Sequence, residues 1–108
     1  MSLANYHTPQ LTGTYGSIFG SLLALATETD NIVIQTILPC FKEIALDNLI
    51  QIHRELIARN VKYGVLEAVR IQTMQELKLE AGPFPDGTDQ IFQGIHDEVN
   101  QAIKEHLL

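Results

Sequence analysis

The sequence predicts an all-α fold: a four-helix, bundle-like domain with an extra short helix before Pro39. Apolar residues recur at helical spacing along several stretches, as they do in helices that each bury one face. Glycine and proline are densest at 82–87, where a connection between helices is expected. A length of 108 residues suits one domain. We therefore expect a flexible N-terminal lead-in at 1–13 and a single helical domain at 14–108.

Residues 41–60 are predicted to form one amphipathic helix around which the fold is organised. About half of its circumference is apolar at 3.6 residues per turn, comprising Phe41, Ala45, Leu46, Leu49, Ile50, Ile52, Leu56 and Ile57. An apolar face this wide must pack against two or more neighbours. The pattern therefore places this helix near the middle of the bundle.

Three further helices are predicted at 15–26, 65–80 and 88–107. The first and the last carry one-sided apolar stripes. The helix at 65–80 differs, because Ile71 and Met74 point away from its main apolar side. Apolar residues on two sides indicate either a position between layers or contact with a second copy of the chain. We thus treat Ile71 and Met74 as candidate interface residues of a homodimer.

The segment at 32–38 is rich in β-branched residues, which suits a strand. A lone strand would leave its edges unpaired, however, and no partner strand is evident. We favour a short helix that ends at Leu38, with Pro39 either kinking the chain or starting the next helix. Cys40 has apolar neighbours and is expected to be an inert core thiol. A single thiol fits a reducing compartment, so we expect a cytoplasmic protein.

The formal net charge of −6 argues against nucleic acid as a partner, because phosphates bind to positive surfaces. Acidic residues dominate 82–108, where Lys104 is the one basic residue. This acidic helix is either a solvated face or a docking surface for a basic partner. No apolar run is long enough to span a bilayer, so no membrane partner is expected.

No pattern of metal ligands or catalytic groups stands out. None of the four histidines has a second histidine at helical spacing, and neither a serine-nucleophile motif nor a phosphate-binding loop is present. We therefore expect no metal and no cofactor. His53 and Lys42 fall within the apolar half of 41–60 and are candidate ligand-binding residues. They lie about 16 Å apart along the helix and cannot share one ligand. Alternatively, His53 is an imidazole at the core edge, and the Lys42 stem covers apolar surface.

The leading prediction is a non-catalytic helical interaction module, such as a small adaptor, immunity or regulatory protein. It would act through an acidic or apolar surface on a protein partner or on a second copy of itself. The alternative is a small enzyme or small-molecule binder with a pocket beside His53.

Overall fold

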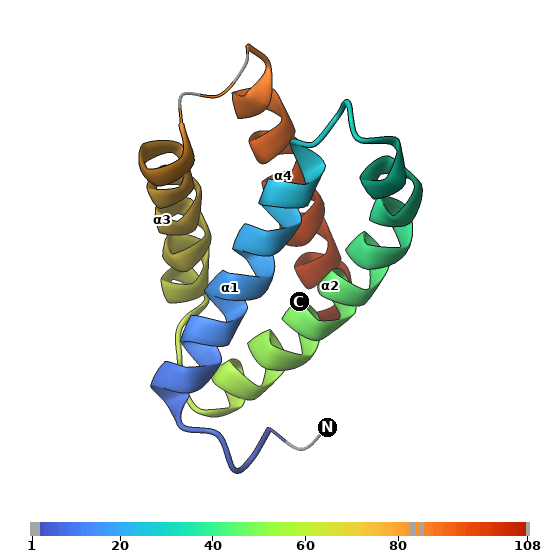
Figure 1. Ribbon diagram of the computed structural model, residues 1–108. Coiled ribbons are helices and arrows are strands. Elements are labelled where there is room, and N and C mark those ends of the chain that lie inside the picture. Colours follow the sequence, from blue (N-terminus) through green and yellow to red (C-terminus); the bar gives the residue numbers. More distant parts are fainter. Residues whose placement is uncertain (1–2, 83, 85, 108) are drawn as a thin grey trace.

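The computed structural model describes residues 3–82, 84 and 86–107. In that part of the chain it contains four helices and no strand (Figure 1): α1 Thr8–Ala26, α2 Ile32–Ala58, α3 Tyr63–Ala81 and α4 Thr88–Leu107. Consecutive helices run in opposite directions in a bundle-like arrangement. The prediction of an all-α fold is confirmed. Residues 1, 2, 83, 85 and 108, which belong to the predicted lead-in and domain, lie outside the described residues.

The helix in the middle of the bundle is α1, and not the helix at 41–60 that we expected there. α1 packs against each of the other three helices, whereas α2 packs against α1 and α4. Figure 1 shows α1 between α2 and α3, with α4 behind it. The reason is that α1 carries no charged side chain, so several of its sides can face neighbours. Its buried residues are Leu11, Tyr15, Phe19, Leu22, Leu23 and Ala26.

The apolar face predicted at 41–60 is buried along the middle of α2 and becomes solvent-exposed toward the C-terminal end of the helix. Four of the predicted residues are buried, namely Ala45, Leu49, Ile52 and Leu56. Ile57 was expected in the core but is 37% exposed. This face therefore packs as predicted over its central turns and at Phe41, which packs against the core, while Ile57 near its C-terminal end is left partly exposed.

α1 begins at Thr8, earlier than the predicted start after residue 13. Pro9 lies in the first turn, where a proline removes no intrahelical hydrogen bond. The Gln10 side chain accepts a hydrogen bond from the His7 backbone N–H at 2.8 Å, and buried Leu11 extends the apolar stripe toward the N-terminus. Residues 8–13 therefore belong to the helical domain.

α2 continues through Pro39, so the predicted separate helix before that residue does not form. The segment 32–38 is helical, as favoured, but it makes up the first turns of α2. Asn31 caps this start, because its Oδ1 accepts a hydrogen bond from the Ile34 N–H at 3.1 Å. An interior proline costs a helix about 3 kcal/mol. Pro39 is exposed, so water can reach the carbonyl group that loses its partner.

α2 ends in a left-handed residue, as predicted for Asn60, whose φ is 67°. The Asn60 N–H donates to the Ile57 carbonyl at 2.9 Å, and the Val61 N–H donates to the Leu56 carbonyl at 3.0 Å. This pair of bonds is a Schellman motif, which satisfies the last carbonyl groups of the helix. The chain thereby turns directly into α3.

Small residues let α3 approach α1 closely. A methyl group built on Gly16 would lie 3.5 Å from atoms of Val69 and Thr73, and one on Gly20 would lie 3.3 Å from the Thr73 methyl. A methyl group on Gly13 would meet nothing within 4 Å. The approach is therefore tightest at Gly20.

An alanine series along α1 tests this packing. Alanine is favoured over glycine in a helix interior by about 1 kcal/mol, so Gly13→Ala should raise the free energy of unfolding by roughly that amount. Gly20→Ala should gain less or lose stability, because Thr73 must give way. Urea unfolding measures both changes. A larger gain at Gly20 than at Gly13 would contradict the close α1–α3 approach.

Candidate functional site

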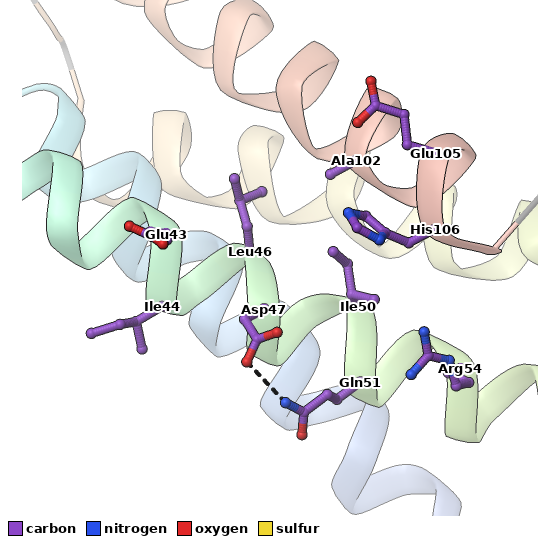
Figure 2. Close-up of a pocket in the computed structure, with 10 residues that line it drawn as sticks. All are labelled: Glu43, Ile44, Leu46, Asp47, Ile50, Gln51, Arg54, Ala102, Glu105 and His106. Atoms are coloured by element: carbon purple, nitrogen blue, oxygen red, sulfur yellow. Dashed lines mark hydrogen bonds between the residues drawn. The ribbon is translucent and has the colours of Figure 1, made fainter.

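A broad groove lies on the surface between α2 and α4 (Figure 2). It has a volume of about 880 Å³ and is open to solvent. Its lining comprises Glu43, Ile44, Leu46, Asp47, Ile50, Gln51 and Arg54 of α2, with Ala102, Glu105 and His106 of α4. The groove therefore follows the C-terminal halves of two helices that run in the same direction.

The groove combines an apolar floor with an acidic rim. Leu46 and Ile50 project from α2 toward α4, where Ala102 faces them (Figure 2). The acidic groups on its edges are Glu43, Asp47 and Glu105, set against the single guanidinium of Arg54. Apart from its bond to Gln51, in which Asp47 Oδ2 accepts from Gln51 Nε2 at 2.9 Å, the Asp47 carboxylate is open to solvent. This surface suits a ligand that is apolar on one side and positively charged on its flanks.

Lys42 joins the same two helices near this groove. Its Nζ lies 3.2 Å from Glu98 Oε2 of α4, and this ion pair is partly exposed. His53, the other candidate ligand-binding residue, is fully buried instead. The structure therefore does not bring Lys42 and His53 together, in agreement with their spacing along the helix.

His53 belongs to a polar cluster inside the bundle. Its Nδ1 lies 3.5 Å from the Tyr15 hydroxyl oxygen, and its ring centroid lies 5.4 Å from that of Tyr63. The centre of this cluster is Arg70 of α3, which is 0% exposed. Arg70 Nη1 donates to the Tyr15 hydroxyl at 2.5 Å, and its Nη2 donates to Asn100 Oδ1.

Asn100 of α4 extends this cluster to a second histidine. Its Oδ1 also accepts a hydrogen bond from the Tyr63 hydroxyl at 2.8 Å, and its Nδ2 lies 3.4 Å from Nε2 of buried His96. All four helices thus contribute a polar side chain to the interior. Among the described residues, three buried side-chain atoms have no hydrogen-bond partner: His53 Nε2, Arg70 Nε and His96 Nδ1.

The histidines of this cluster are held neutral. Burial lowers the pKa of His53 to about 4, and the positive charge of Arg70 adds to this effect. Burial and Arg70 also lower the pKa of His96, while the carboxylates of Asp97 and Glu67 act weakly in the opposite direction. The interior therefore holds one permanent positive charge beside two imidazoles that resist a second one.

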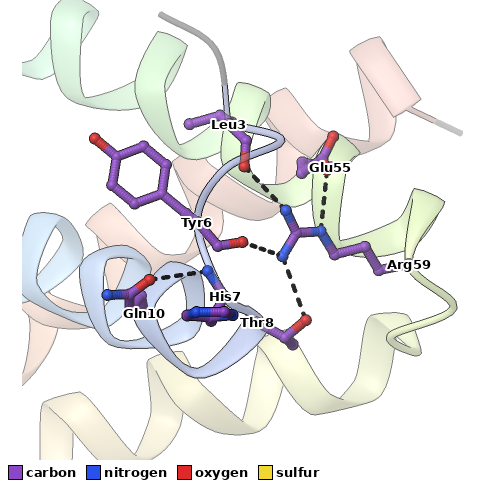
Figure 3. A network of polar contacts seen from close by, with 7 residues as sticks. All are labelled: Leu3, Tyr6, His7, Thr8, Gln10, Glu55 and Arg59. Atoms are coloured by element: carbon purple, nitrogen blue, oxygen red, sulfur yellow. Dashed lines mark hydrogen bonds and ion pairs between the residues drawn. The ribbon is translucent and has the colours of Figure 1, made fainter.

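The N-terminal segment is tied to the end of α2 by Arg59 (Figure 3). The guanidinium donates to the carbonyl groups of Tyr6 at 2.6 Å and Leu3 at 2.9 Å, and its Nε pairs with Glu55 Oε1 at 3.0 Å. Leu3 also packs on the core. This contact orders part of the segment that we expected to be a lead-in.

An apolar stripe on the first half of α2 has no covering helix. Val33, Ile37 and Ile44 are exposed, and Ile32 beside them is 80% exposed. Cys40 lies on the same stripe and is exposed, which corrects the prediction of a core thiol. The reason is that neither α1 nor α4 covers this side of α2, although its residues are as apolar as a core.

The predicted interface residues on α3 occupy different environments. Ile71 is 39% exposed, whereas Met74 is half-buried and packs against the core. The two residues do not form a continuous exposed apolar surface comparable to the stripe on α2.

Within the described residues, no group of three or more His, Cys, Asp or Glu side chains could hold a metal ion. None of the helices in that part of the chain is long and apolar enough to cross a membrane. Comparison with models of known families, with curated proteins and with solved structures finds no match for this chain. Arguments about function therefore rest on the groove, the stripe and the polar cluster.

The buried neutral His53 predicts a pH-dependent stability. The unfolded imidazole takes up a proton near its ordinary pKa of 6.5, whereas the folded one resists protonation down to a pKa of about 4. The unfolded state thus binds more protons between these values, so stability is complete above pH 6.5 and is lost as the pH falls toward 4. Between pH 7 and pH 5 the free energy of unfolding should fall by roughly 2 kcal/mol, as measured by urea unfolding.

A matched pair of variants isolates this effect. His53→Leu should reduce the pH dependence between pH 7 and 5, because it removes one of the two buried imidazoles, and His96 should retain the remainder. His106→Leu alters an exposed histidine and should keep the slope of the original protein. An unchanged slope in His53→Leu would show that His53 is not the group responsible.

Proposed function

We propose that this protein is a non-catalytic interaction module whose α2–α4 groove binds a basic, amphipathic helical segment of a partner protein. The observation that carries this proposal is the apolar floor of Leu46, Ile50 and Ala102 beneath an acidic rim. Helices dock into such grooves through residues at i, i+3, i+4 and i+7. A small adaptor, immunity or regulatory protein would act in this way.

Charge complementarity supports a basic occupant. The rim groups Glu43, Asp47 and Glu105 outnumber Arg54, and the whole chain has a net charge of −6. A basic segment would be steered toward this field, and a like-charged one would be repelled. The occupant therefore needs Lys or Arg on both flanks of an apolar stripe.

Self-association is a second mode of interaction, supported by the stripe on α2. Val33, Ile37, Cys40 and Ile44 follow one another at intervals of four, three and four residues, which is the spacing of a coiled-coil seam. A second copy could cover this seam with the same stripe in antiparallel orientation, giving a homodimer. An exposed free thiol at Cys40 also supports a reducing, cytoplasmic setting.

The alternative function, a ligand binder or small enzyme beside His53, is supported by the polar cluster. Arg70, Tyr15 and Asn100 offer hydrogen bonds there, but no carboxylate or thiol of the described residues joins them. The cluster thus favours binding over catalysis.

A model peptide tests the groove. The probe is a helical peptide of about 14 residues with leucine at i, i+3, i+4 and i+7 and lysine on its flanks. It should shift the backbone amide NMR signals of residues around Leu46, Ile50 and Ala102. Glu43→Gln/Asp47→Asn/Glu105→Gln should weaken its binding roughly tenfold, because exposed ion pairs contribute about 0.5 kcal/mol each.

The matched control is Asp30→Asn/Glu76→Gln/Glu80→Gln, which removes as much charge from exposed sites outside the groove. It should leave the affinity within about twofold, since distant charges are screened. Equal weakening by both triple variants would show that the peptide follows net charge and not the groove.

Cys40 reports on the homodimer. Its exposure predicts rapid labelling by a thiol reagent at low protein concentration, and labelling should slow at high concentration if the α2 stripe pairs. Ile37→Glu should abolish this concentration dependence. Ile71→Glu should preserve it, because Ile71 lies on α3. A dimer through α3, as the sequence pattern suggested, would instead leave Cys40 labelling independent of concentration. Sedimentation of a pure monomer at hundreds of micromolar would exclude both dimers.

A further inference from the structure

The polar cluster around Arg70 contains a charge that no ion pair balances among the described residues. Arg70 is fully buried, and an arginine cannot lose its proton inside a protein. The ion pairs of the described residues join Lys42 to Glu98, Arg59 to Glu55 and Lys78 to Asp89, so none of them involves Arg70. Burying an unpaired charge is strongly unfavourable.

The hydrogen bonds of Arg70 fix the direction of the bond to His53. A guanidinium only donates, so the Tyr15 hydroxyl oxygen accepts from Arg70 and directs its own hydrogen elsewhere. The acceptor within reach is His53 Nδ1 at 3.5 Å. The neutral imidazole of His53 therefore carries its hydrogen on Nε2.

The same reasoning fixes the tautomer of His96. Asn100 Oδ1 accepts from both Arg70 and Tyr63, so its Nδ2 faces His96 Nε2 as a donor. His96 Nε2 must accept this bond, and the hydrogen of that imidazole lies on Nδ1.

Every unpaired buried atom of the cluster is consequently a donor. His53 Nε2, Arg70 Nε and His96 Nδ1 each carry a hydrogen and have no acceptor. The carboxylates of Asp97 and Glu67 act on His96 at a distance. Among the described residues, however, no carboxylate is hydrogen-bonded to the cluster, which has surplus donors and one positive charge. Water supplies acceptors but leaves the charge of Arg70 unbalanced.

We propose that the Arg70 cluster binds a small oxyanion of the phosphate or carboxylate class. Such an anion supplies several acceptor oxygens and the missing negative charge, and arginine pairs with it through two parallel N–H groups. The donors at His53 and His96 lie one hydrogen-bonded side chain away from Arg70, so the anion engages Arg70 Nε first and either histidine second.

The route to this site runs past α3. That helix makes its main contacts with α1, across Gly16 and Gly20, and buries only Leu66 and Arg70 completely among its described side chains. A small outward movement of α3 therefore admits the anion without opening the α1–α2 core. This site is separate from the α2–α4 groove, and the proposal does not depend on the interaction function.

Titration with inorganic phosphate and, separately, with acetate tests the proposal at constant ionic strength maintained with sodium chloride. One of the two anions should raise Tm by a few degrees in a saturable manner and should shift the ¹⁵N–¹H signal of Arg70 Nε. The arm that responds identifies the class. Arg70→Met keeps an unbranched stem, removes the guanidinium and its charge, and should abolish the response. Arg54→Met removes an exposed guanidinium in the groove and should preserve it.

The NMR signal of Arg70 in the unaltered protein decides the matter even if Arg70→Met fails to fold. A signal unmoved by either anion, together with a Tm response no larger than that to chloride, would overturn the proposal and leave the cluster to internal water. A Tm response retained in Arg70→Met would place the anion elsewhere.

Discussion

The arrangement of the bundle depends on the burial of one uncharged helix, α1. Each large apolar side chain that it buries completely contributes about 1.5–3 kcal/mol, and Phe19, Leu22 and Leu23 are among those with no exposed surface. Because α1 has no charged side chain, all three of the other helices can pack against it. α2 and α4 both pack on α1 and also contact each other, yet they leave a groove along their outer edge. The same constraint that builds the core therefore creates the surface on which we base the proposed function.

α3 is held by a different balance of forces. Its side facing α1 includes Thr73 and Arg70 among its apolar residues, so it gains less from burial than α2 or α4. The hydrogen bonds of Arg70 fix the position of α3 instead. The guanidinium donates to both Tyr15 and Asn100, so α3 must lie where both acceptors are within reach. Buried polar groups of this kind tend to select one packing over others more than they add stability. Its contacts with α1 and the hydrogen bonds of Arg70 thus fix the position of α3, and the proposed anion site lies behind it.

The helices could be predicted from the sequence because their apolar periodicity is local. The burial of some individual side chains and the position of the groove could not, because they depend on which helices pack together. Arg70 lies about 40° from Leu66 around the helix, inside the apolar arc of α3, so its burial was legible. It was not among the candidate residues, because a long basic side chain usually reaches solvent. For Cys40, apolar neighbours in the sequence could not reveal that no helix covers that side of α2. The groove was equally hidden, since it arises from the separation of α2 and α4 and from no motif in either.

The two candidate sites share the same pair of helices. α2 directs His53 inward to the polar cluster and Ile50 outward to the groove, while α4 does the same with Asn100 and Ala102. An occupant of either site contacts both helices or groups bonded to them, so it favours one separation between them. If the other site has a higher affinity for its ligand at that separation, thermodynamic linkage makes the effect mutual. Each ligand then raises the affinity of the protein for the other ligand by the same factor. An anion bound at Arg70 would then change the affinity of the α2–α4 groove for a partner helix, although the anion and the partner helix are not in contact.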